Sequence, residues 1–141
     1  MIRQKVTQYC VPMPNDIASI SRLAKVLSEE QIGVAGLMAE RYSDISVVTF
    51  LTEEETKPVR SALESAGFKV FERPAFLLDI PNHPGEISGL AKCLADEDIN
   101  IESIYGTTNA AGAAKLVLAV DQIDKAQTAL GKYVEKARVA V

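Results

Sequence analysis

The chain has 141 residues, of which 48% are hydrophobic and 24% are charged, and its formal net charge is -4. This composition is typical of a globular protein and excludes the disordered, collagen-like and low-complexity classes. The longest apolar run, Gly33 to Ala39, is far shorter than the roughly 20 residues of a membrane-spanning helix, so we expect no membrane partner. The acidic balance and scattered basic residues argue against nucleic acid as a partner.

The first residues lack the apolar core of a secretory signal. The two cysteines, Cys10 and Cys93, match neither a disulfide framework nor a metal-binding spacing. These features favour a cytoplasmic location.

An internal repeat organises the sequence. Shifting the chain against itself by 67 positions aligns residues 14–32 with residues 81–99, with ten identities in nineteen positions. Pro14-Asn15 aligns with Pro81-Asn82, for example. An identity of this extent over an ungapped segment indicates a duplicated unit.

Hydrophobic periodicity predicts the elements of each repeat in chain order. Alternating apolar residues predict the first strand, apolar residues at i, i+3, i+4 and i+7 predict the first helix, and Thr52-x-x-Glu55 resembles a capping box that would start the second helix. The first repeat reads strand, helix, strand, strand, helix, strand at 9–13, 20–27, 34–41, 45–51, 52–66 and 69–71. The second reads the same at 75–80, 87–94, 99–105, 114–120, 121–133 and 134–139, with a turn over 106–112.

The order βαββαβ, written twice, predicts an α+β protein with two ferredoxin-like domains, residues 1–71 and 72–141. In each domain, both helices would cover one face of an antiparallel sheet. The other face and an edge strand would stay open, so we expect the two units to pack together and the chain to form a homodimer.

A search for catalytic groups finds little. The single histidine, His83, has no Cys, Asp or Glu at metal-binding spacing, and the phosphate-loop, dinucleotide-loop and nucleophile-elbow motifs are absent. The sequence therefore predicts a protein that is not an enzyme and that needs no cofactor or metal.

The segment from Asp79 to Ile87 could form a binding site. Pro84 suits the first turn of a helix, and Gly85 would let a ligand approach the backbone N–H groups there, which attract a carboxylate. The amides of Asn82 and Asn100 offer the acceptors and donors that an α-amino acid requires. A structural interpretation stays open, in which both asparagines are turn or capping residues and His83 is an exposed loop residue.

The pattern Asn82-His83-Pro84-Gly85, with Leu90 and Leu94 after it and Asp98-Ile99-Asn100-Ile101-Glu102-Ser103-Ile104 beyond, resembles the ACT domain, a regulatory module of amino-acid metabolism. The resemblance covers nearly the whole chain as two copies. It implies that an amino-acid effector binds at an interface between two ACT units. The first copy keeps Asn15 but has Ile17, Ala18 and Gly33 where the second has Pro84, Gly85 and Asn100.

We therefore expect a non-catalytic regulatory protein that binds a free amino acid or a similar small zwitterion and acts on an enzyme of amino-acid metabolism. The alternatives are an interaction module without a ligand and a small enzyme on a ferredoxin-like scaffold. The ligand-binding residues implied are Asn82, His83, Pro84, Gly85, Asn100, Ile101 and Asn15. The sequence names neither the amino acid nor the regulated partner.

Overall fold

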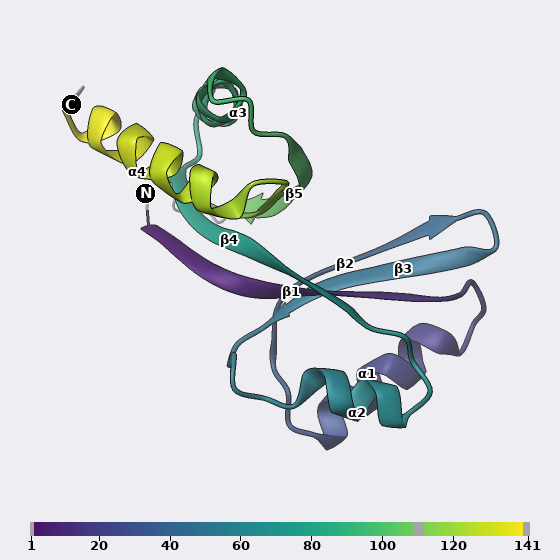
Figure 1. Ribbon diagram of the computed structural model, residues 1–141. Coiled ribbons are helices and arrows are strands. Elements are labelled where there is room, and N and C mark those ends of the chain that lie inside the picture. The colour runs from purple at the N-terminus through teal and green to yellow at the C-terminus, as the bar shows by residue number, and fades with distance from the viewer. Residues whose placement is uncertain (1, 109–111, 140–141) are drawn as a thin grey trace. The chain divides into compact units, whose positions relative to one another are not determined.

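The computed structural model describes residues 2–108 and 112–139, which form six strands and four helices (Figure 1). The strands are β1 (Ile2–Pro14), β2 (Val34–Tyr42), β3 (Ile45–Thr52), β4 (Phe71–Pro81), β5 (Ile101–Thr108) and β6 (Ala113–Val120). The helices are α1 (Ser19–Glu29), α2 (Val59–Ser65), α3 (Glu86–Asp96) and α4 (Ile123–Val139). Because the strands pair antiparallel and alternate with helices, the α+β class is confirmed.

Two compact units divide the chain. The first unit is Val6–Arg73, and the second unit combines Met1–Lys5 with Pro74–Val141. The first unit takes the start of β4 and the second unit takes the start of β1, so these strands contribute to both units. The predicted boundary at residue 71 assigns each strand to a single domain. It differs from the observed units because β1 and β4 are both longer than the periodic segments that predict them.

In the first unit, the strand order is β2-β3-β1, and both helices cover one face of the sheet. Alternate residues of β1 point toward the helices, and the rings of Tyr9 and Phe50 stack with centroids 5.4 Å apart. Leu23 and Leu27 of α1 and Leu63 of α2 complete this core. Burial of these apolar side chains stabilises the unit.

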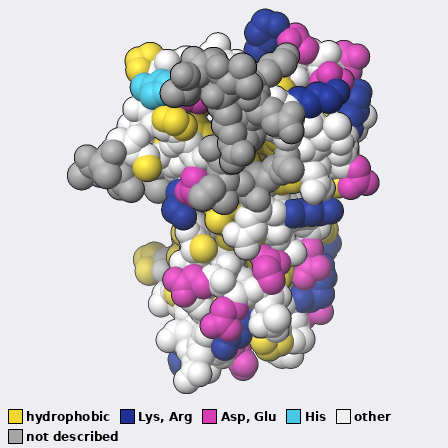
Figure 2. Space-filling view, turned by 90° about the vertical axis from the view of Figure 1, so that its left-hand side faces the viewer, with side chains coloured by type: hydrophobic (Ala, Val, Ile, Leu, Met, Phe, Trp, Pro, Cys, Tyr) yellow, Lys and Arg dark blue, Asp and Glu magenta, His cyan; other side chains and the backbone are white. Residues whose placement is uncertain are grey.

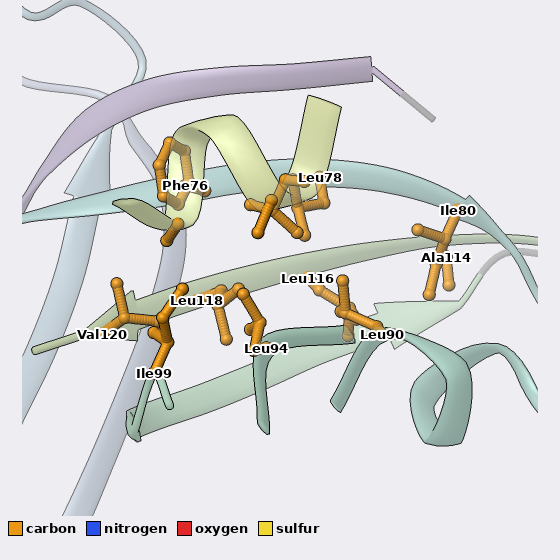
Figure 3. Packing of buried hydrophobic residues seen from close by; sticks show 13 residues of the cluster. Phe76, Leu78, Ile80, Leu90, Leu94, Ile99, Ala114, Leu116, Leu118 and Val120 are labelled. Atoms are coloured by element: carbon orange, nitrogen blue, oxygen red, sulfur yellow. The ribbon is translucent and has the colours of Figure 1, made fainter. Parts of the chain in front are cut away.

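The second unit repeats this arrangement with strand order β4-β6-β5. Figure 3 shows its core, in which side chains of α3 lie against those of β4 and β6. The core residues labelled there are Phe76, Leu78, Ile80, Leu90, Leu94, Ile99, Ala114, Leu116, Leu118 and Val120.

The same backbone conformation follows the first helix of each unit. Gln31 after α1 has φ 55° and Asp98 after α3 has φ 57°, and these residues are 67 positions apart. Left-handed conformations of non-glycine residues are uncommon, so their recurrence at equivalent positions supports the duplication.

Three predicted elements are wrong. The predicted strand at 69–71 is not a separate strand, because of these residues only Phe71 is extended and it begins β4. The predicted strand at 134–139 continues helix α4, which extends to Val139. The helix predicted from Thr52 begins only at Val59, because Pro58 restricts the backbone and Thr52 ends β3. The Thr52 hydroxyl donates to the carbonyl of Glu54 instead of capping a helix. The predicted turn over 106–112 is shorter, since β5 continues to Thr108, and 109–111 lie outside the described residues.

Candidate functional site

A pocket of about 320 Å³ lies in the second unit, where β4 ends and α3 begins. Its volume is at the lower end of the range for small-molecule sites. It is lined by Ile80, Pro81, Asn82, His83, Glu86, Ile87, Ile104, Tyr105, Gly106, Ala114 and Leu116.

The base of the pocket is aliphatic. Ile80 of β4 pairs in register with Ala114 of β6, and Figure 3 shows these two side chains together at one end of the core. Leu116 lies two residues further along β6, and all three side chains are at most 6% exposed. A ligand that reaches this base therefore meets methyl and methylene groups.

Gly106 of β5 keeps the pocket open beside Leu116. The two residues are paired in register, and a Cβ atom at position 106 would collide with the carbonyl oxygen of Lys115 and with Cδ2 of Leu116. A larger residue would fill space at the pocket wall and strain the strand pair. The glycine thus has a steric function that the sequence motif did not indicate.

Three polar lining side chains, Asn82, His83 and Glu86, lie on the loop and first turn of α3. Asn82 is fixed by its backbone N–H, which donates to the carbonyl of Gly112 at 2.8 Å. His83 Nε2 lies 3.1 Å from Glu86 Oε1. The histidine side chain is 59% exposed and the glutamate side chain 20%, so Glu86 is the more enclosed member of this pair. Figure 2 shows the histidine in cyan at the surface, beside hydrophobic side chains in yellow.

Glu86 is also held from α4. The Tyr133 hydroxyl hydrogen-bonds the Glu86 carboxylate, and burial followed by the charge of Glu86 raises the pKa of Tyr133 above its usual value. A Cβ atom on Gly89 would lie 2.9 Å from the Tyr133 hydroxyl oxygen, so the glycine makes room for this contact. His83 and Tyr133 together fix the position of a carboxylate that lines the pocket.

The turn before α3 and the first turn of this helix both contribute side chains to the pocket lining. Gly85 precedes the helix with φ 95°, a conformation that other residues adopt only with strain. Gly85 has no side chain that could cap this helix, and the backbone N–H of Glu86 donates to the carbonyl of His83 at 3.4 Å. The backbone N–H groups of a first helical turn need acceptors and carry the positive end of the helix dipole. A bound carboxylate would satisfy both needs.

The equivalent position in the first unit is occupied. The carboxylate of Asp16 accepts the backbone N–H groups of Ala18 at 3.1 Å and Ser19 at 2.8 Å, at the start of α1. Asp16 aligns with His83 in the repeat. The first unit therefore supplies its own carboxylate to the helix, whereas the second unit has an imidazole at that position.

The structure brings together only part of the predicted site. Asn82 and His83 line the pocket, and Pro84 and Gly85 form the turn between them and α3. Asn15 belongs to the first unit, where its side-chain oxygen accepts a hydrogen bond from Ser46 Oγ at 3.0 Å.

Asn100 and Ile101 lie away from the pocket within the same unit. Along β6, Ala113 pairs with Pro81 and Val120 pairs with Ile101. Seven residues of strand span about 20 Å. Asn100 is therefore at the other end of the sheet, where its backbone N–H donates to Asp121 Oδ1 at 3.0 Å. This contact agrees with the structural interpretation of Asn100 as a turn residue.

Sequence reasoning missed the aliphatic wall and Glu86. Glu86 directly follows the Pro-Gly pair and is three residues from His83, so a tight turn at this pair brings the two side chains together. That spacing was an available signal. The wall residues of β5 and β6 gave none, because their juxtaposition with α3 depends on tertiary structure.

Within residues 2–108 and 112–139, no three His, Cys, Asp or Glu side chains are grouped as metal ligands would be. In the same part of the chain, no helix has the length and apolar character to span a membrane.

No known protein family matches the sequence, and no curated protein matches it significantly. Solved structures do match. A protein from Bacteroides thetaiotaomicron superposes with a TM-score of 0.84 at 21% identity, over 92% of this chain and 89% of that one. The regulatory subunit of aspartate kinase from Thermus thermophilus gives a TM-score of 0.69 at 15% identity, over 95% of this chain and 94% of that one.

This chain has the fold of that regulatory subunit. Aspartokinase III from E. coli is also similar, with a TM-score of 0.57 at 20% identity, over 90% of this chain and 31% of that one. The matched region is thus about a third of a larger enzyme.

Proposed function

We propose that this chain is a non-catalytic regulatory protein of the ACT family that binds a free amino acid, or a similar small zwitterion, in the pocket of its second unit. The observation that carries the proposal is the difference between the two helix starts. Asp16 closes the start of α1, whereas the start of α3 has Gly85 and a pocket beside it. The carboxylate that the first unit provides from its own chain would come from the ligand in the second.

The polar end of the pocket offers partners for both charges of a zwitterion. The ligand carboxylate would accept N–H groups of the first turn of α3, with His83 close by. The ligand ammonium would donate to the carboxylate of Glu86 and to the amide oxygen of Asn82. Hydrogen bonds to charged groups are among the stronger ones, so these contacts would supply orientation as well as affinity.

The sequence motif and the fold both support this assignment. The segment Asn82-His83-Pro84-Gly85 has the ACT pattern, and the fold is shared with an aspartate kinase regulatory subunit. On this proposal the chain consists of two tandem ACT domains, residues 1–71 and 72–141, with an exchange of strand segments at β1 and β4. Its regulated partner would be an enzyme of amino-acid metabolism.

A homodimer would give Asn100 and Ile101 a place in the site. Both lie at the far end of the sheet from the pocket of their own unit, so they would contribute only from another ACT unit. The thiols of Cys10 and Cys93 agree with action in the reducing cytoplasm.

A thermal-shift screen of the common amino acids tests the proposal. A ligand that binds only the folded state raises the melting temperature by mass action. We expect at least one amino acid to do so in the wild type and in Asn15→Ala, and to do so much less in Asn82→Ala. Each variant is compared with its own ligand-free melting temperature.

The alternatives predict other results. An interaction module without a ligand would show no shift with any amino acid. A ligand site in the first unit would lose its shift with Asn15→Ala and keep it with Asn82→Ala. Either result would contradict the proposal.

A further inference from the structure

We infer that the pocket selects an amino acid with an aliphatic side chain. This inference rests on the proposed function and concerns which ligands the pocket distinguishes. It follows from how polar and apolar groups are distributed along the pocket walls.

The polar and the aliphatic lining side chains come from different parts of the unit. Asn82, His83 and Glu86 lie on the loop and first turn of α3. Ile80, Ala114 and Leu116 line the pocket from the paired strands β4 and β6 and belong to the hydrophobic core. A zwitterionic head group bound by the loop and helix residues would therefore direct its side chain toward the core.

The aliphatic side chains Ile80, Ala114 and Leu116 offer no counter-charge to a charged ligand side chain. Among the lining residues, His83 and Glu86 are the ones that can pair with a charge and they already contact each other, while Tyr105 contributes a hydroxyl. A lysine or aspartate side chain placed against Ile80 and Leu116 would lose water without gaining a counter-charge. Burial of an unpaired charge is strongly unfavourable, so such ligands would bind weakly.

A small hydroxyl side chain would also be disfavoured. The base residues present no donor or acceptor side chain, and a serine-sized group would leave much of the aliphatic wall without contacts. Branched alkyl groups would fill the same space and remove apolar surface from water. Differences of one or a few methylene groups in such a pocket change affinity by about tenfold or more.

Ile104 provides a variant that changes the wall without changing the core. It lines the pocket from β5 and is 40% exposed. Leu37 is its aligned residue in β2 of the first unit and is 49% exposed. Ile104→Ser and Leu37→Ser are therefore matched substitutions on equivalent strands, one in the lining of the pocket and one in the first unit.

Isothermal titration calorimetry with L-valine, L-leucine, L-isoleucine, L-serine, L-aspartate and L-lysine tests the inference. We expect the best aliphatic ligand to bind at least about tenfold more tightly than the other three. Ile104→Ser should weaken its binding several-fold, whereas Leu37→Ser should leave the dissociation constant unchanged.

If serine, aspartate or lysine binds as tightly as the aliphatic ligands, and Asn82→Ala abolishes that binding, the inference is wrong and the proposed function stands. If Ile104→Ser and Leu37→Ser weaken binding equally, Ile104 does not contact the ligand side chain and the inference is also wrong. If no amino acid binds at all, both the inference and the proposed function fail.

Discussion

The carboxylate of Asp16 accepts the backbone N–H of Ser19 at 2.8 Å, and so closes the start of helix α1. Ser19 is 5% exposed, so this capping hydrogen bond lies beside buried residues. At the aligned position of the second unit, His83 turns to Glu86 instead. The two units thus share the helix but differ in whether the aligned side chain accepts N–H groups at its start.

Replacing Asp16 by alanine should lower the melting temperature by a few degrees at neutral pH, because the first-turn N–H groups lose their acceptor. Hydrogen bonds from the Ser19 hydroxyl and backbone lower the pKa of Asp16. A lowered pKa contributes stability that is present above the unfolded-state value and is lost as pH falls through the folded-state value. Urea unfolding should therefore show a wild-type advantage at pH 7 that shrinks by about pH 3. An advantage that does not change with pH would contradict this role.

The contact between Tyr133 and Glu86 should be visible in a double-mutant cycle with Gly89. Tyr133→Phe removes a hydrogen bond to a carboxylate and should cost about 1 kcal/mol of unfolding free energy. In the wild type, the methyl group of Gly89→Ala would displace the Tyr133 hydroxyl, and this loss would offset the stability that alanine gains from its higher helix propensity. In the Tyr133→Phe background the same substitution should stabilise by up to about 1 kcal/mol. Additive effects of the two substitutions, measured by chemical denaturation, would mean that Gly89 does not serve this contact.

Gly106→Ala should destabilise the protein by about 1 to 3 kcal/mol, because its Cβ meets backbone and a buried leucine. Gly33→Ala is the comparison, since its Cβ meets the carboxylate end of Glu53, which can rotate away. Thermal unfolding should rank the variants in that order. A smaller cost for Gly106→Ala than for Gly33→Ala would show that the β5 and β6 pair relaxes around position 106.

The repeat and the apolar periodicity predicted the helices α1 and α3 and the loop Asn82–Gly85. Those features depend on local sequence patterns, and the pattern of the first helix occurs in both repeats. The predicted strand at 134–139 failed because a short apolar segment fits either a strand or the last turns of a helix. The helix predicted from the capping box at Thr52 was wrong because Thr and Glu at this spacing also occur in strands and turns, and because Pro58 restricts where a helix can start.

Residues of the pocket wall could not be predicted, because they are joined by strand register and not by spacing in the chain. The register of β5 against β6 places Gly106 beside Leu116 and moves Asn100 to the far end of the sheet. A difference of a few residues in that register would have put another side chain at the wall. The contact of Tyr133 with Glu86 joins two helices 47 positions apart, and no local pattern specifies it.

The most direct test of the central claim is an NMR titration of the uniformly ¹⁵N-labelled chain with the amino acid that gives the largest thermal shift. We expect saturable changes in the backbone N–H signals of Glu86, Ile87 and Asn82. We expect no comparable change at Ser19 and Ile20, the aligned residues at the start of α1, where Asp16 already occupies the helix end. Changes centred on Ser19 and Ile20, or no saturable change at α3, would contradict ligand binding at the start of α3.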